Sequence, residues 1–424
     1  MTTRHAFPTT QRTAWRIIAG VAAVQLVACG LGSLRADDWV NLERGRVALS
    51  SDWRTIWTTL NPFTLYRPLV DVWHGTMVAL FGYEPGFMLA MLVGHLALQS
   101  WLLSRLVRQL GGSRETAALA ALAVWAQSNT YTWTTLWVSN ATGSLMTTFA
   151  LLTMVALASA ARLRSQGRSA RMRMSLMLFA YVATMLCKEE SVLLPGVVAA
   201  LATMRWHEAK QEERRTWIGG IALSLALGAI YVGFRTVVLA TPQMPGNRYT
   251  LHLGPHVFRN LGFFAVHLGA LPITVAVLAR FQFPFAFTPA ARQMRGWAQA
   301  RTGILAGLAW TVVACLLYLP ISGRPAYGYL YAPAFGIAFA VAHALTFAAN
   351  AQATTTRPRS PWSTLAVHAL IATSLTAAAL VSNQWHRFGA IHREALITLR
   401  REVPDPPPNA IFVFLDSGAP ETPS

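Results

Sequence analysis

An adjacent pair of carboxylates, Asp37 and Asp38, follows the first apolar segment of the sequence and precedes Trp39. Adjacent carboxylates repel each other, so the pKa of one rises and that group can act as a base towards a hydroxyl. The pair could instead cap a short interfacial helix that runs to Arg46, with Trp39 as an interfacial aromatic side chain. The spacing alone does not choose between these interpretations.

Arg67 stands at the start of a predicted helix, because Pro68 suits the first helical position. The residues that follow place an apolar stripe on one face of that helix: Leu69, Val72, Trp73, Leu80 and Phe81. This pattern predicts an amphipathic helix on the outer membrane surface. The guanidinium of Arg67 and the free amide groups of the helix start could bind a phosphate together. The alternative is a plain interfacial arginine.

Lys188, Glu189 and Glu190 interrupt an otherwise apolar region. Ionisable groups at membrane depth are costly and usually face a cavity or a transport pathway. The alternative is a lysine that extends towards water beside its own glutamate partner. Arg235 and Arg324 are further isolated cations that could contact an anion.

The composition excludes a soluble globular protein and an intrinsically disordered one. Hydrophobic residues make up 54% of the 424 residues and charged residues 12%, about half of the roughly 25% usual for globular domains. The apolar residues fall into eleven segments, which predict an all-α polytopic protein of about eleven transmembrane helices. They are 15–34, 87–104, 116–136, 140–161, 174–187, 191–204, 216–239, 260–279, 302–320, 328–349 and 363–382.

The fifth and sixth segments are each too short to cross a hydrocarbon core of about 30 Å. They flank Lys188, so we expect two short helices that meet at a sunken turn. The transmembrane domain is expected to cover residues 1–382, with a large first outer loop at 35–86 that carries surface helices. Residues 383–424 are expected to form a short outer tail.

The formal net charge of +18 reflects topology in this interpretation and does not indicate a nucleic-acid partner. Most of the 35 basic residues fall in the loops that are inside if the amino terminus is cytoplasmic, together with only four acids: Glu115, Glu208, Glu212 and Glu213. Basic loops face the cytoplasm in membrane proteins, and anionic membrane lipid is the expected partner of these loops. An odd number of spans then places the carboxyl terminus outside.

Cysteine and histidine spacings predict neither disulfides nor a metal site. Cys29, Cys187 and Cys315 lie far apart in apolar segments, and His252 and His256 are separated by glycine and proline without a third ligand. The sequence before Cys29 also matches a bacterial lipoprotein cleavage site, although an uncleaved first span is the preferred interpretation.

These features occur in an order that resembles a known family. The features in that order are Asp37-Asp38, Tyr66 to Leu69, Leu80-Phe81-Gly82, His95, Arg105 to Gly112, Lys188-Glu189, Leu193-Leu194-Pro195, Arg235 and Tyr329-Leu330-Tyr331. Together they cover most of residues 37–335 and resemble the polytopic GT-C glycosyltransferases, particularly bacterial relatives of the protein O-mannosyltransferases. The second outer loop carries Gln127-Ser128 where relatives usually have a His-Pro pair and an acid.

The resemblance implies transfer of a sugar from a polyprenyl-phosphate-linked donor to an acceptor hydroxyl on the extracytoplasmic face. The acceptor could be a glycan, a lipid or a protein. Asp37 or Asp38 would act as the base, and Lys188, Arg67 or Arg235 would hold the leaving phosphate. Glu189 and Arg324 complete the expected substrate-binding residues. No cofactor is implied, and a divalent cation is left as an open alternative.

A non-catalytic carrier of polyprenyl phosphate, or an assembly partner on the same scaffold, is the second hypothesis. Arginine far outnumbers lysine and alanine is abundant, which is typical of a GC-rich bacterial genome. The expected location is therefore a bacterial inner membrane.

Overall fold

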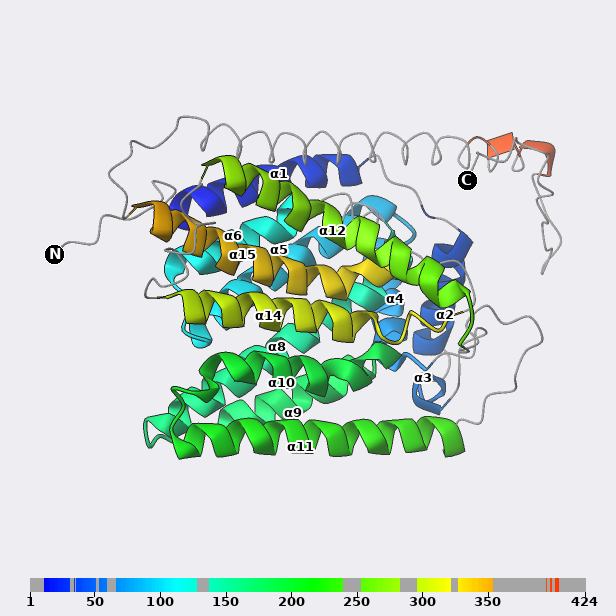
Figure 1. Ribbon diagram of the computed structural model, residues 1–424. Helices are drawn as coiled ribbons and strands as arrows, with labels where there is room; N and C mark the ends of the chain where they lie inside the picture. Colours follow the sequence, from blue (N-terminus) through cyan, green and yellow to red (C-terminus); the bar gives the residue numbers. More distant parts are fainter. Residues whose placement is uncertain are drawn as a thin grey trace.

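The computed structural model describes residues 11–30, 34, 36–50, 53–58, 66–127, 137–238, 253–282, 296–321, 327–353, 394, 397–398 and 401–403. Within these residues the chain is helical and forms no β-strand. Most of the long helices run side by side (Figure 1).

The described helices follow one another along the chain. Their bounds are α1 Gln11–Cys29, α2 Ala36–Ser50, α3 Thr55–Thr58, α4 Pro68–Phe81, α5 Pro85–Gln109, α6 Arg114–Ala126, η1 Val138–Asn140, α8 Ala141–Ser165, α9 Arg171–Met185, η2 Glu189–Leu193, α10 Leu194–Trp206, α11 Gln211–Gly233, a π-helical turn η3 Phe234–Val238, α12 His256–Gln282, α14 Trp297–Cys315, η5 Tyr327–Leu330 and α15 Tyr331–Ala353.

Ten of the eleven predicted apolar segments overlap helices, and the eleventh, 363–382, lies outside the described residues. Within the described part of the chain, five helices are long and apolar enough to cross a membrane, which indicates a multi-pass membrane protein. They are Pro85–Gln109, Val138–Ser165, Gln211–Val237, His256–Thr274 and Gly328–Ala351.

The two predicted short helices are confirmed as α9 and α10. The 15 residues of α9 rise only about 22 Å, less than the roughly 30 Å of a hydrocarbon core. The connection between them contains Lys188 and the 3₁₀ helix η2. The charged triplet therefore sits where two short helices end, not in the middle of a long one.

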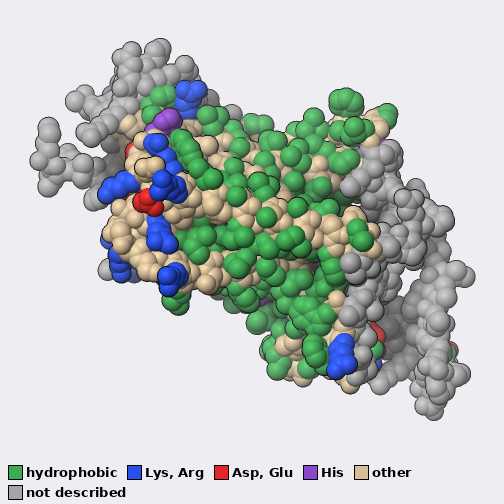
Figure 2. Space-filling model, turned by 90° about the horizontal axis from the view of Figure 1, so that it is seen from below, with side chains coloured by type: hydrophobic (Ala, Val, Ile, Leu, Met, Phe, Trp, Pro, Cys, Tyr) green, Lys and Arg blue, Asp and Glu red, His purple; other side chains and the backbone are tan. Residues whose placement is uncertain are grey.

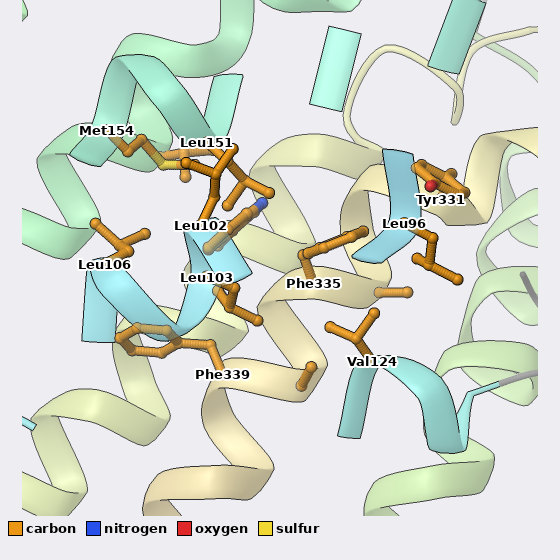
Figure 3. Close-up of a cluster of buried hydrophobic side chains, with 14 of the residues drawn as sticks. Leu96, Leu102, Leu103, Leu106, Val124, Leu151, Met154, Tyr331, Phe335 and Phe339 are labelled. Atoms are coloured by element: carbon orange, nitrogen blue, oxygen red, sulfur yellow. The ribbon is translucent and has the colours of Figure 1, made fainter. Parts of the chain in front are cut away.

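The core lies where α5, α6, α8 and α15 meet. Side chains from all four helices interdigitate there: Leu96, Leu102, Leu103 and Leu106 from α5, Val124 from α6, Leu151 and Met154 from α8, and Tyr331, Phe335 and Phe339 from α15 (Figure 3). Close packing of such large side chains provides the dispersion energy that holds helices together.

A buried amide also joins three of these helices. The Gln99 Nε2 group of α5 donates to the Ser144 carbonyl oxygen at 2.7 Å and to Thr148 Oγ1 at 2.9 Å, both on α8. The Tyr331 hydroxyl of α15 donates to Gln99 Oε1 at 2.6 Å. Since each of these buried polar groups finds a partner, the network adds specificity without an unsatisfied group.

Helix α4 turns a different face to the protein from the one that its apolar stripe predicts. Val70 and Met77 are buried, and so are the polar residues Asp71 and His74, whereas Leu80 is 65% exposed. Asp71 can be buried because α2 packs across α4 and Arg44 pairs with its carboxylate. Of the predicted stripe, Trp73 is buried, Leu80 is exposed, and the rest are half-buried: Leu69, Val72 and Phe81.

The crossing of α2 and α4 depends on two glycines. A Cβ atom on Gly45 would lie 2.5 Å from the Gly75 backbone nitrogen and 2.7 Å from the Asp71 carbonyl oxygen. A Cβ atom on Gly75 would meet the backbone of Gly45 just as closely. The two backbones therefore touch, and no side chain fits between them.

Basic side chains gather at one end of the molecule, while apolar side chains cover most of the visible face beyond them (Figure 2). Arg108, Arg164 and Arg205 lie in the last turns of α5, α8 and α10. This segregation agrees with the charge asymmetry that the sequence predicts for the connecting loops.

We predict that Gly307→Ala destabilises the protein by about 1–3 kcal/mol, as overpacking typically does. A Cβ atom there would lie 2.6 Å from the Gly336 carbonyl oxygen and 2.7 Å from the Ala340 nitrogen, so α14 and α15 would have to separate. Thermal unfolding in detergent measures the loss. Gly219→Ala is the control, because nothing lies within 4 Å of a Cβ atom at that helical position. Equal stability of the two variants would contradict the close packing.

Candidate functional site

Glu189 binds two arginines that come from distant parts of the chain. Its Oε2 atom lies 2.9 Å from Arg67 Nη2, and its Oε1 atom lies 2.9 Å from Arg235 Nη1. Arg67 precedes α4, Glu189 begins η2, and Arg235 lies in the π-helical turn after α11. One carboxylate therefore ties together three separate elements.

The charge balance keeps Glu189 ionised. Burial opposes the charged form, but the guanidinium groups of Arg67 and Arg235 outweigh it and lower the pKa of this carboxyl to about 2. The three side chains are between 20% and 23% exposed. Their attraction is therefore screened less than that of a surface ion pair.

Lys188 lies beside this group in a second, more enclosed set of contacts. Its Nζ atom is 2.5 Å from Glu190 Oε1 and donates to the Tyr318 hydroxyl at 2.9 Å. The same ammonium lies 5.3 Å and 5.6 Å from the ring centroids of Tyr318 and Tyr329, which stack on each other at 4.3 Å. These contacts compensate the charge of a lysine that is only 7% exposed.

Local backbone structure brings the start of α4 against the Lys188 turn. The Leu69 N–H group donates to the Leu186 carbonyl oxygen at 3.3 Å, directly after α9. The Tyr66 ring meets Phe234 edge to face at 5.8 Å, at the end of α11. Pro68 fits at the start of α4 because its missing N–H is not needed there.

Asp38 is fully enclosed. Its Oδ1 atom accepts hydrogen bonds from the Ser139 backbone N–H and hydroxyl, both at 2.6 Å. Asn41 Nδ2 donates to the Ser139 hydroxyl at 3.0 Å. The carboxylate is 0% exposed, so it reaches a substrate only after α2 or its neighbours move.

The aspartate pair lies within the first turn of α2 and does not precede it, because the helix already starts at Ala36. The expected helix through Arg46 is confirmed and extends to Ser50. Carboxylates in a first turn are stabilised by the helix dipole. The side chain of Asp37 lies outside the described part of the structure.

The half-buried Arg44 and the buried Asp71 and His74 were not among the predicted site residues. Arg44 Nη2 lies 2.8 Å from Asp71 Oδ2 and links α2 to α4. Burial raises the pKa of Asp71 to about 6 in spite of Arg44 and Arg67, and burial lowers the pKa of His74 to about 4. The spacing of Asp71 and His74 by three residues, inside an apolar helix, is the sequence signal for a polar face.

An apolar groove borders the Lys188 contacts. Glu190, Ser191 and Tyr318 contribute polar groups to its lining. The remainder of the lining comes from α8, α10, α14 and their neighbours and includes Met146, Leu151, Met154, Val197, Trp310 and Ala314. A groove of this composition suits a hydrocarbon chain whose polar head lies at the charged residues.

The structure thus brings together Arg67, Lys188, Glu189 and Arg235, four of the predicted site residues. Lys188 does pair with a glutamate of its own turn, as the alternative interpretation expected. Arg324 lies outside the described residues. Asp38 lies on α2 and bonds Ser139 of η1.

Among the described residues, no group of three or more His, Cys, Asp or Glu side chains could hold a metal ion. Asp38 uses its Oδ1 atom for Ser139, and Glu189 uses both carboxylate oxygens for arginines.

Comparisons with protein-family models, curated proteins and solved structures give no match to this chain.

We predict that Glu189→Gln lowers stability near neutral pH, because Arg67 and Arg235 lose their shared counter-ion. The pKa of Glu189 is about 2, below its ordinary value of 4.5. The stability that the charge contributes is therefore present above pH 4.5 and is lost as the pH falls through about 2. Loss of one partner from a buried ion pair costs roughly 3 kcal/mol.

Thermal unfolding in detergent between pH 7 and pH 3 tests this dependence. The difference between wild type and Glu189→Gln should shrink as the pH falls. Glu43→Gln removes an exposed partner of Arg46 and should have a much smaller effect. A wild-type advantage that stays constant across this pH range would contradict the assigned role of the Glu189 charge.

Proposed function

We propose that this protein is an integral-membrane glycosyltransferase that transfers a sugar from a polyprenyl-phosphate-linked donor to an acceptor hydroxyl. The order of motifs that resembles the GT-C glycosyltransferases motivates the proposal. The observation that carries it is the convergence of Arg67, Lys188 and Arg235 beside an apolar groove.

The cluster gathers three cations in one place. Arg67 and Arg235 meet at Glu189, Lys188 pairs with Glu190, and Arg67 also acts on Asp71. Cations placed where negative charge develops are usually the largest catalytic contribution, and a departing lipid phosphate develops charge at its bridging oxygen.

The groove supports the lipid part of the donor. Its apolar lining between α8, α10 and α14 continues from Glu190 and Tyr318, which belong to the Lys188 contacts. A donor bound with its phosphate at the cations would lay its isoprenoid chain along this lining. A water-soluble nucleotide sugar has no hydrocarbon chain that would occupy this groove.

The proposed reaction needs one base and one leaving group. The acceptor oxygen forms a bond to the anomeric carbon as the bond from that carbon to the phosphate oxygen breaks. The acceptor proton passes to Asp37 or Asp38, and the phosphate leaves with the bond electrons. Because Ser139 donates two hydrogen bonds to the Asp38 carboxylate, the acceptor must displace Ser139 before it can give its proton to Asp38.

We place the protein in a bacterial inner membrane with about eleven spans, its amino terminus in the cytoplasm and its carboxyl terminus outside. The segregation of basic side chains to one end supports this orientation (Figure 2). The Lys188 turn is at the other end of α10 from Arg205, which supports a site on the extracytoplasmic side. The acceptor is a glycan, a lipid or a protein.

We predict that Asp38→Asn and Asp37→Asn, made singly and together, identify the base. Loss of the base should reduce sugar transfer by roughly 10²- to 10⁴-fold. The measurement is transfer from radiolabelled polyprenyl-phosphate sugar to cell-envelope acceptors by the purified protein in proteoliposomes. Glu43→Gln is a matched control on the same helix, because its partners Arg46 and Tyr83 are on the surface. Near-normal transfer by the folded double variant would refute the assignment.

The enclosure of Asp38 favours a second candidate function, a non-catalytic carrier of polyprenyl phosphate or its sugar conjugate. A carboxylate that is 0% exposed and bonded to Ser139 can be purely structural. The same radiolabelled donor separates the two functions. A carrier binds or moves the donor and leaves it intact, whereas a transferase releases polyprenyl phosphate.

A further inference from the structure

Asn260 of α12 binds the end of α14 through its side-chain amide. Its Nδ2 atom donates to three backbone carbonyl oxygens at 3.3, 3.0 and 2.9 Å, those of Tyr318, Leu319 and Ile321. These groups belong to residues 316–321, which follow α14 and are called here the Tyr318 turn. The last carbonyl groups of a helix have no partner within it. Asn260 is only 1% exposed and supplies that partner.

Two further side chains of α12 hold the same turn. His256 Nε2 donates to the Pro320 carbonyl oxygen at 3.2 Å, one helical turn before Asn260. One helical turn after Asn260, the centroid of the Phe264 ring lies 6.1 Å from that of the Tyr318 ring. Residues four positions apart lie on one face of a helix. One face of α12 therefore fixes both the backbone of the Tyr318 turn and the ring that it carries.

The surroundings of α12 make a buried asparagine on this helix informative. Phe258, Leu261 and Val266 are 77%, 51% and 68% exposed, as expected of a helix that faces lipid. A side-chain amide is costly on such a helix unless it bonds a neighbouring element. Asn260 meets this condition only through the Tyr318 turn and its own neighbour Arg259 among its side-chain contacts here.

The Tyr318 turn carries a partner of Lys188. The Tyr318 hydroxyl accepts from Lys188 Nζ at 2.9 Å, and Glu190 pairs with the same ammonium. An ammonium has three N–H donors, so these two partners among the described residues fix its orientation and leave one N–H group for a ligand. The rings of Tyr318 and Tyr329 also face the charge. A cation held in this way meets an anion without having to reorient.

We propose that Tyr318 and Asn260 are positioning residues for a phosphate that binds Lys188. Asn260 fixes the Tyr318 turn, and the Tyr318 hydroxyl orients the ammonium, so neither side chain has to touch the phosphate. This role rests on the proposed function in one respect, the binding of a polyprenyl phosphate at this site. A transferase and a carrier share that step, so the role can be tested without sugar transfer.

Two variants and a matched control separate positioning from general stability. Tyr318→Phe keeps the ring that stacks on Tyr329 and removes only the hydroxyl. Asn260→Leu removes the amide that holds the turn. Tyr181→Phe is the control, because it removes a hydroxyl from a fully buried tyrosine of α9 that does not line the groove. That hydroxyl has no hydrogen-bond partner among the described residues.

The probes are farnesyl phosphate and farnesol, each titrated by calorimetry into the full-length protein in neutral detergent. Farnesol has the same hydrocarbon chain without the phosphate, so it measures the groove, which Tyr318 also lines. We expect Tyr318→Phe and Asn260→Leu to weaken farnesyl phosphate binding about tenfold and to leave farnesol binding unchanged. Tyr181→Phe should bind both probes as wild type does. An equal loss of farnesol affinity in Tyr318→Phe would show that the hydroxyl only shapes the groove, and would overturn the proposal.

A second background tests whether Tyr318 acts through Lys188. Lys188→Met combined with Glu190→Gln removes both charges, so neither is left buried without its partner. Adding Tyr318→Phe to this background should not change farnesyl phosphate affinity further, because residues that act through one another are not additive. A further tenfold loss there, or no binding of farnesyl phosphate by wild type, would overturn the proposal.

Sugar transfer by the wild-type protein is measured separately, so the two proposals can fail independently. Normal transfer together with unchanged farnesyl phosphate binding by Tyr318→Phe would overturn the positioning role and leave the transferase intact. Weakened binding by Tyr318→Phe without any transfer by wild type would support the positioning role and favour the carrier.

Discussion

The ion pairs of Glu189 are the interaction on which this end of the protein depends. Burying a carboxylate costs several kcal/mol unless a cation compensates it, and here two guanidinium groups do so. Neither arginine is near Glu189 in the sequence, so the contact also fixes how the start of α4 and the end of α11 meet the Lys188 turn. Removal of Arg67, Glu189 or Arg235 would leave an uncompensated charge in a partly buried site.

That arrangement explains how a helical bundle can hold a strongly charged cluster beside an apolar groove. Lys188 uses Glu190 and the faces of two tyrosines, while the arginines share Glu189. The acids are therefore structural partners that hold the cations in place. In the proposed reaction, cations that are already oriented would need little rearrangement to meet the phosphate.

The sequence predicts the helices well because long apolar runs bounded by charge have few alternatives in a membrane. It also predicts the Lys188 turn, since two runs near 14 residues cannot each span a bilayer. The partners of Glu189 could not be predicted, because spacing carries no information about contacts between residues 46 or 122 positions apart. Asp71 and His74 were missed for a related reason: they interrupt an apolar helix, and only the packing of α2 shows that this polar face is buried.

The backbone contact between Gly45 and Gly75 has a mechanical consequence. No side chain separates the two helices there, and Arg44 of α2 pairs with Asp71 of α4, so the two helices are joined at two neighbouring points. Asp38 lies on α2 and Arg67 stands at the start of α4. A displacement of α2 that uncovered the Asp38 carboxylate would therefore also load the ion pair between Arg67 and Glu189.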